Sequence, residues 1–301
     1  MKLLCATDLL PRCESAMDRA GMLAEQLGAD LSLLHVVAPT ERRGPLELGL
    51  QNAGARLEAR ARAPLWKHGS PPNVRVRAGN PARILIETSI ELNAGLVVMG
   101  IPGNQSVRDA LGGKTAQRAL SALKCPVLFV RGAPQENYRH VLLALDSSKA
   151  SASAVRAAEA LALKDDVRAS VVHAYRPLHK SMHASVGFAV DSVSYAEAWK
   201  RKATAGLRAL LEQTSSDVSR YEFNLVGAPT TAVVHNVIDG LKPDLLILGT
   251  HGYGQLRRAL AGTVANRVLT TTECDVLVVP EGAAVRVPQR ERAGIGNHAS
   301  A

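Results

Sequence analysis

Aromatic residues are scarce in this chain, at 3% of its 301 residues, although hydrophobic residues of all kinds make up 47%. Leu, Val, Ala and Ile must therefore fill the core. The net charge of +9 is compatible with nucleic-acid binding. However, the arginines are scattered among alanines, and few aromatic rings are available to stack on bases. We therefore interpret the charge as a solvated basic surface that suits small anionic ligands, and we expect no nucleic-acid partner.

Cysteine is also rare, and the chain lacks a long apolar run. Its four cysteines form no Cys-x-x-Cys pair, so we expect no disulfide framework. No apolar run reaches the roughly 18 residues of a transmembrane helix, so we expect no membrane partner. The apolar start resembles a signal peptide, but Asp8, Pro11 and Arg12 interrupt it, and it predicts a strand instead. These absences together favour a cytoplasmic protein.

The sequence contains no recognisable catalytic constellation. It has neither a Ser-His-Asp order with a nucleophile elbow nor paired carboxylates at a plausible site. His179 and His183 have the i, i+4 spacing of a helical metal pair, but no third ligand or His-Glu context accompanies them. We therefore predict no catalytic residue and no protein metal ligands, which favours binding over turnover.

The chain contains an internal repeat, which changes how every other pattern is interpreted. Five segments recur in one order: residues 3–8 with 141–146, 31–37 with 169–175, 79–81 with 227–229, 96–100 with 245–249, and 125–130 with 274–279. Asp8 thereby matches Asp146, and His35 matches His173. The repeat indicates a tandem duplication.

Each copy alternates apolar, strand-like runs with segments whose apolar residues have helical spacing. The helical segments are residues 14–27, 83–92, 115–123, 151–163 and 231–241. This alternation predicts an α/β fold of two tandem doubly wound, Rossmann-like domains, each with a five-stranded parallel sheet.

The domain boundaries follow from the repeat and from changes in composition. We predict a first domain at residues 1–131, a linker at 132–138, a second domain at 139–280 and a disordered tail at 281–301. Residues 178–196 make the second copy longer than the first. They predict either an active-site lid or a mobile loop.

A glycine-rich stretch organises the second copy. The sequence Gly-Thr-His-Gly begins at Gly249, directly after an apolar run, and a Gly-Thr pair follows at Gly262. Glycine lets a backbone approach a ligand with no Cβ in the way. Thr263 stands where a helix is expected to begin, so its hydroxyl and the first free N–H groups would hold a phosphate. In doubly wound sheets, ligands bind beyond the carboxyl ends of the strands where strand order reverses. The matched Asp and Gly residues lie at such strand ends.

The spacing Gly-x2-Gly-x9-Gly-Thr, the Asp after the first strand and the His at the end of the second resemble the universal stress protein family. The resemblance covers both copies and implies an adenine nucleotide alpha hydrolase-like fold and a stress-response role. It also implies binding of ATP, AMP or ADP, with Mg²⁺ accompanying a bound triphosphate. Asp146 matches the residue that receives the adenine amino group. In chain order, the implied nucleotide-binding residues of the second domain are Asp146, Ala174, Gly249, His251, Gly252, Gly262, Thr263 and Val264.

The first domain carries a divergent copy of this set, namely Asp8, Val36, Gly100, Gly103, Gly113, Lys114 and Thr115. Lys114 stands where the family has Ser or Thr, and Pro102 stands in the place of His251. A lysine meets a phosphate as a point charge but does not reproduce a hydroxyl contact, and proline removes a backbone donor. Gly113-Lys-Thr is not a P-loop, because Arg108 occupies the position of the required first glycine. The second domain is the better predicted site.

The same residues are also compatible with simpler structural roles. Asp8 and Asp146 also suit caps of the helices that follow them. The glycines of the motif also suit plain turns. We expect His35 and His173 to satisfy backbone groups at strand ends rather than to take part in catalysis.

Three functions fit these patterns, and a regulatory switch fits them best. In that interpretation ATP orders the loop between Gly252 and Gly262 and presents a changed surface to an unknown protein partner. The alternatives are a scaffold that acts through protein or lipid partners without nucleotide, and a slow ATPase. The last strands of the two copies would be exposed apolar edges in isolation. The resemblance implies that they pair as an intramolecular pseudo-dimer, and it is compatible with a further homodimer.

Overall fold

The computed structural model of the chain describes residues 1–38, 45–62, 66–101, 122–146, 148–161, 166–175, 192–215, 217–227, 230–250, 272–283 and 285. Within these ranges the order of elements repeats, so we call residues 1–131 the first half and residues 139–280 the second half. Among the described residues, no helix is both long enough and apolar enough to cross a membrane.

The first half alternates strands and helices from its first residues. Its elements are β1 (Lys2–Thr7), η1 (Pro11–Cys13), α1 (Glu14–Leu27), β2 (Asp30–Val37), α2 (Leu46–Ala61), β3 (Asn73–Ala78), α3 (Pro81–Glu91), β4 (Leu96–Gly100) and β5 (Val127–Val130).

The second half repeats this order with a longer helix before its third strand. Its elements are β6 (His140–Ala144), α6 (Lys149–Leu161), β7 (Arg168–Tyr175), α8 (Ser192–Thr214), η3 (Val218–Arg220), β8 (Tyr221–Gly227), α9 (Thr230–Leu241), β9 (Leu245–Thr250) and β10 (Asp275–Pro280).

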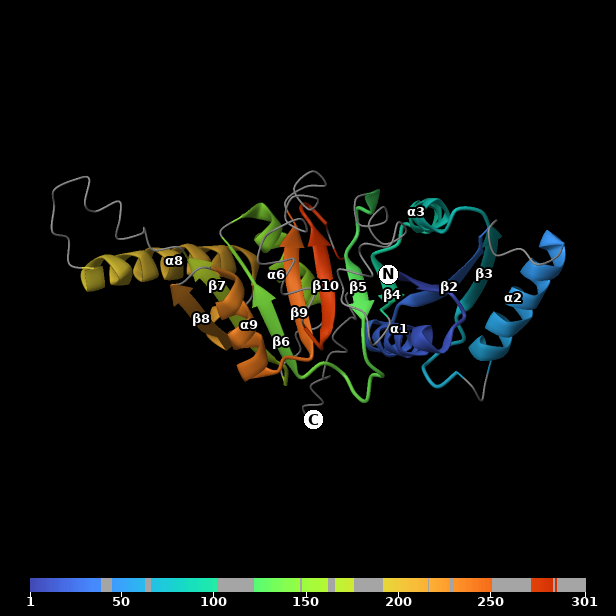
Figure 1. The fold of residues 1–301 in the computed structure, drawn as a ribbon, viewed down its shortest axis with the longest axis horizontal. Coiled ribbons are helices and arrows are strands. Elements are labelled where there is room, and N and C mark those ends of the chain that lie inside the picture. The colour runs from blue at the N-terminus through green and yellow to red at the C-terminus, as the bar shows by residue number, and fades with distance from the viewer. Residues whose placement is uncertain are drawn as a thin grey trace, which may run out of the picture.

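The ten strands of the described residues form one sheet, in the order β3-β2-β1-β4-β5-β10-β9-β6-β7-β8. The strands of each half are mutually parallel, as the predicted doubly wound fold requires. The halves meet where β10 pairs antiparallel with β5, and these two strands lie side by side at the centre of the molecule (Figure 1). The predicted α/β fold class is therefore confirmed, and the two sets of five strands join into one continuous sheet.

Helices cover both faces of this sheet because successive strand residues point to opposite sides. One apolar cluster joins α1, α2, α6 and α8 to strand residues such as Leu3 and Leu143. The other cluster joins α3 and α9 to the alternate residues, such as Leu4 and Leu142. Both clusters contain residues from both halves, so the core is continuous across the β5–β10 junction.

The Gly-x-Pro turn of the first half has a purely local explanation. Gly79 has a φ of 144°, which glycine tolerates and other residues avoid. The side chain of Asn80 then caps α3 by accepting a hydrogen bond from the Arg83 N–H at 3.2 Å, and Pro81 occupies the first helical turn. In the first half this motif is therefore a strand-to-helix turn.

The predicted boundaries of two segments need correction. α8 begins at Ser192, so the end of the segment 178–196 is helical rather than a lid or loop. Residues 281–283, which were predicted to belong to the tail, form a packed turn. Gly282 donates its N–H to the Ser153 hydroxyl at 3.0 Å and Ala283 is buried, so this turn packs against α6. Most of the predicted helix 115–123 lies outside the described residues, as do residues 286–301.

Candidate functional site

Each half reverses its strand order at one point. In the first half β1 lies between β2 and β4, and in the second half β6 lies between β7 and β9. The chain leaves β1 and β6 toward helices on one face, and it leaves β4 and β9 beyond the same edge. Such a point opens a crevice at the carboxyl ends of the strands, which is where open α/β sheets bind ligands. The predicted Asp and Gly residues lie at both of these points.

Asp146 follows β6 in the second half, and the next turn fixes its carboxylate. Its Oδ1 accepts hydrogen bonds from the Ser148 N–H at 3.0 Å and from the Ser151 hydroxyl at 2.7 Å. The Ser151 hydroxyl in turn accepts the N–H of Asp146 at 2.8 Å. The Ser148 hydroxyl accepts the N–H of Ser151 at 3.2 Å, which is the geometry of a helix cap at the start of α6. An exposed carboxylate is thus held in one orientation at the edge of the sheet.

Asp8 has the matching position after β1. Its Oδ1 accepts the Leu10 N–H at 2.9 Å, which is the same contact that Asp146 makes two residues along. Cys13 takes the place of Ser151, and its thiol lies against the backbone and side chain of Asp8. Burial raises the pKa of this thiol to about 11, so it stays protonated at neutral pH. Both Asp residues therefore brace the turn that enters a helix, which is the simpler structural role.

The two matched histidines secure the same strand ends. His35 Nδ1 lies 2.9 Å from the Thr7 carbonyl oxygen, and His173 Nδ1 lies 2.8 Å from the Leu145 carbonyl oxygen. Because a carbonyl only accepts, each Nδ1 carries the proton in these contacts. The expectation that these histidines satisfy backbone groups is confirmed.

Gly249 ends the fourth strand of the second half at a point with no room for a side chain. A Cβ there would lie 2.4 Å from the Ala150 carbonyl oxygen and 2.9 Å from the Ser151 nitrogen. The first turn of α6 therefore packs directly against the end of β9. This contact alone explains the glycine, and it also brings the Asp146 turn and the end of β9 together at one crevice.

The register of the strands places the remaining described candidates next to these residues. Ala144 pairs with Val172, so Ala174 lies two residues farther along the neighbouring strand, level with Asp146. Thr7 pairs with His35, so Val36 is level with Asp8. Gly100 ends β4 opposite Val130, in the position that Gly249 has in β9.

The other predicted nucleotide-binding residues lie outside the described residues. In the second half they are His251, Gly252, Gly262, Thr263 and Val264, and in the first half they are Gly103, Gly113, Lys114 and Thr115. The histidines 179 and 183 also lie outside. The described part of the candidate site is thus Asp146, Ala174 and Gly249 in the second half and Asp8, Val36 and Gly100 in the first.

Ser148 and Ser151 are the site residues that the sequence analysis missed. Both lie within five residues of Asp146 and both bond to its turn. The signal was present, because a polar Asp-Ser-Ser sequence before a helical pattern is typical of a cap.

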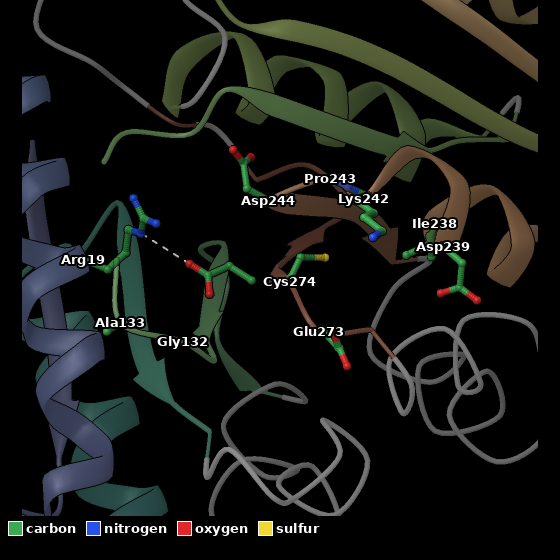
Figure 2. A pocket seen from close by; sticks show the side chains of 11 residues that line it. Arg19, Gly132, Ala133, Ile238, Asp239, Lys242, Pro243, Asp244, Glu273 and Cys274 are labelled. Carbon is green, nitrogen blue, oxygen red and sulfur yellow. Dashed lines mark ion pairs between the residues drawn. The ribbon is translucent and has the colours of Figure 1, made fainter. Parts of the chain in front are cut away.

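A cleft of about 750 Å³ lies between the halves, at the edge of the sheet where the second half's strands begin and β5 of the first half ends (Figure 2). Its wall includes Asp244 and Cys274, which directly precede β9 and β10, together with Arg19 of α1. Asp244 and Cys274 lie at the amino ends of the second half's strands, so the cleft is separate from the nucleotide site predicted for the second half. Among the described residues, no group of three or more His, Cys, Asp or Glu side chains is placed to hold a metal ion.

Comparison with known proteins places this architecture in a family. The profile of the Universal stress protein family matches residues 1–131 and 137–280. A universal stress protein of Mycolicibacterium smegmatis is 25% identical over 303 residues, covering 92% of this chain and 96% of the relative. Universal stress protein A homolog 1 of Coxiella burnetii is 30% identical over 145 residues, covering 48% of this chain and 96% of the relative.

A solved structure agrees on the fold over nearly the whole length. A universal stress protein from Archaeoglobus fulgidus superposes with a TM-score of 0.68 at 18% identity, covering 93% of this chain and 98% of that chain. The Coxiella relative is nearly spanned by about half of this chain, as expected of a duplicated unit. With the family profile matching each half in turn, the chain belongs to the universal stress protein family, as a member with two copies of the domain.

Proposed function

We propose that the second half binds an adenine nucleotide, with ATP as the first candidate, and that the chain acts as a nucleotide-responsive regulatory switch. The base would lie at the carboxyl edge of β6 and β7. The phosphates would lie toward the glycine turns that follow β9. The first half would serve mainly as a structural or partner-binding unit.

The observation that carries this proposal is the braced carboxylate of Asp146 at the reversal of strand order. An exposed acceptor held by two donors is oriented before any ligand arrives, which lowers the entropy cost of binding. The exocyclic amino group of adenine is a donor of the matching kind. The Ala174 backbone, level with Asp146, would meet the edge of the base.

The residues proposed to bind the ribose and phosphates are taken from the family pattern. Gly249, His251, Gly252, Gly262, Thr263 and Val264 would surround the ribose and phosphates. Backbone N–H groups at a helix start and a threonine hydroxyl supply the donors that a phosphate needs. A bound triphosphate would bring Mg²⁺ with it, since this ion keeps several waters and needs few protein ligands.

A switch also requires a change that a partner detects. Nucleotide binding would order the arm between Gly252 and Gly262, which is bounded by glycines at both ends. We propose that the ordered arm forms a surface for a protein partner. We also propose that the two halves act together as an internal pseudo-dimer, joined through β5 and β10.

The test is the nucleotide content of the purified full chain. The protein is denatured, and the released nucleotide is separated by chromatography and quantified per chain. Gly262→Val puts a β-branched side chain into the proposed phosphate turn of the second half. Gly113→Val makes the matched change in the first half.

We expect about one nucleotide per chain, lost in Gly262→Val and kept in Gly113→Val. Two nucleotides per chain would show that Lys114 is tolerated and that both halves bind. No nucleotide, together with no binding of added ATP, would overturn the proposal and favour a scaffold that acts without nucleotide.

A further inference from the structure

The strands that join the halves do not by themselves select the pairing that is observed. Val276 pairs with Phe129, Leu277 with Leu128, and Val278 with Val127. Leu277 is the copy of Leu128 in the repeat, so a pseudo-twofold axis passes through this central pair.

Two copies of the chain could instead pair these edge strands with each other. Strand β10 of one chain can pair with β10 of a second chain, and β5 with β5, in the same symmetric register. The sequences Val-Leu-Phe-Val and Val-Leu-Val-Val are apolar in either arrangement, and exposed edges of this kind associate readily. The covalent connection between the halves already favours pairing within a chain, and contacts beside the two strands can add to that preference.

A buried polar network lies beside this junction and includes both halves. Asp275 at the start of β10 and Arg19 of α1 are 5% and 7% exposed. Arg19 Nε lies 3.3 Å from Asp275 Oδ2, and the dashed line in Figure 2 marks this ion pair in the wall of the cleft. Asp275 Oδ1 also accepts the Arg131 N–H at 2.9 Å, directly after β5. Burial raises the pKa of the Asp275 carboxyl, and these donors oppose the shift by stabilising the ionised form.

The segment that connects the halves is part of the same network. The buried Tyr138 donates its hydroxyl to Asp275 Oδ2 at 2.7 Å. Its ring lies 4.0 Å from the guanidinium carbon of Arg19. Arg19 also donates from Nη1 to the Glu136 carbonyl oxygen at 2.8 Å. The connection is therefore anchored to α1 of the first half and to β10 of the second.

The network has no copy on the other side of the pseudo-twofold axis. In the repeat, Pro126 stands in place of Asp275, Ala157 in place of Arg19, and Pro280 in place of Arg131. None of these three residues supplies a charge, and neither proline has an N–H. The interface is symmetric in its strands and asymmetric in its buried charges.

We propose that Arg19, Asp275 and Tyr138 specify the pairing of β5 with β10 inside one chain and exclude pairing between like strands of two chains. In a β10–β10 pairing, each Asp275 would lose Arg19 and meet Ala157 and Pro280 of the other chain. In a β5–β5 pairing, each Arg19 would meet Pro126. Both arrangements bury an unpaired charge twice, which strongly disfavours them. The buried charges thus disfavour pairing of β5 or β10 with the same strand of a second copy of this chain.

A single thiol on the pseudo-twofold axis reports which pairing forms. In Leu277→Cys the new thiol faces Leu128 in the observed pairing, whereas in a β10–β10 pairing it faces its own copy. The full chain is oxidised at fixed concentration, and the disulfide-linked dimer is quantified on a non-reducing gel. The same background without Leu277→Cys corrects for the four natural cysteines.

We expect no linked dimer above that correction when the network is intact. Adding Arg19→Met and Asp275→Leu removes both buried charges, and we expect the linked dimer to rise by about tenfold or more. Arg83→Met is the matched control, because it removes an exposed ion pair with Glu87 and should change nothing. Equal amounts of linked dimer with and without the network would overturn the proposal.

A milder variant keeps the test decisive if the double substitution does not fold. Tyr138→Phe removes one hydrogen bond to Asp275 and leaves the charge pair in place. We expect a smaller rise in linked dimer, with native circular dichroism. In that case, an amount unchanged from the native chain would overturn the proposal.

Discussion

The loop after β1 reads Asp-Leu-Leu-Pro from Asp8, whereas the loop after β6 reads Asp-Ser-Ser-Lys from Asp146. Both begin with the same contact, in which the carboxylate accepts the N–H two residues along. Both also lie beside a histidine that donates to the end of the strand. The two copies thus share these backbone contacts, while the residues that follow each Asp differ, with Leu9 and Leu10 in the first half and two serines in the second.

The divergence changes what the crevice of each half offers a ligand. In the first half Leu9 has a φ of 61°, an uncommon conformation for a bulky residue, and Leu10 is 44% exposed. The turn there is the short helix η1, and α1 begins only at Glu14. In the second half α6 begins at Lys149, after a polar turn with its own serine cap. The second half thus has an α-helix N-terminus and the Asp146 carboxylate beside a polar turn, whereas the first half has a short 3-10 helix and an exposed leucine there.

The largest expected effect comes from breaking the packing that builds the second crevice. Gly249→Ala places a Cβ 2.4 Å from the Ala150 carbonyl oxygen, and backbone cannot move aside as a flexible side chain can. We expect a loss of about 2–3 kcal/mol in the free energy of unfolding, measured by urea denaturation. Nucleotide content should fall with it, because the start of α6 and the Asp146 turn shift together.

Gly240→Ala in α9 is the matched control for this change. Nothing lies within 4 Å of a Cβ at Gly240, so alanine there should raise the free energy of unfolding by about 0.5–1 kcal/mol. If Gly249→Ala were tolerated as well as Gly240→Ala, close packing would not be the reason for the glycine.

A smaller effect is expected from the residue that braces each Asp. Ser151 is 3% exposed and both donates to and accepts from Asp146. Ser151→Ala removes the hydrogen bond that this hydroxyl donates to Asp146 Oδ1 and the one that it accepts from the Asp146 N–H, so we expect a loss of about 1–2 kcal/mol in the free energy of unfolding. Weaker nucleotide binding should accompany it, since the carboxylate is held less firmly when it keeps the Ser148 N–H but loses the Ser151 hydroxyl. Denaturation and equilibrium dialysis with ATP measure the two effects.

Cys13→Ser makes the complementary change in the first half, because it gives Asp8 the hydroxyl that Asp146 has. We expect it to change the free energy of unfolding by less than about 1 kcal/mol. An equal loss in Ser151→Ala and Cys13→Ser would mean that the two turns do not differ in the way their side chains indicate.

The repeat explains why so much of the fold is predictable from the sequence. Each segment occurs twice, so a pattern such as strand, Asp and helix is supported by two copies, and α1 begins and ends at the predicted residues. The helices α2 and α8 and the packed turn at Gly282 were not among the predicted elements. α8 packs against α6 and β8, and Gly282 bonds to α6, so these features depend on contacts between segments distant in the chain.

The candidate site was predictable to the extent that it depends on strand ends and glycine spacing. Asp146, Ala174 and Gly249 were predicted from the repeat and the family resemblance, and they lie at one edge of the sheet. The contact of Gly249 with Ala150 was not predictable, since the sequence does not show which helix turn approaches a strand end. The Arg19–Asp275 pair was missed for the same reason, because its members are far apart in the chain.

The smallest expected effect is a pH dependence of the free energy of unfolding that comes from the second half alone. His140 opens β6 with its Nε2 2.9 Å from the Ser170 hydroxyl oxygen, whereas the first half has Lys2 at the matching position. Burial, and then the nearby Arg168, lower the pKa of His140 from its ordinary value of 6.5. Between the lowered pKa and 6.5 the unfolded chain binds more protons than the folded chain, so stability falls as the pH falls through this window. His140→Gln should remove that part of the slope when urea denaturation is repeated between pH 8 and pH 5. Lys2→Gln should leave it in place, and an unchanged slope in His140→Gln would assign the pH dependence to other groups.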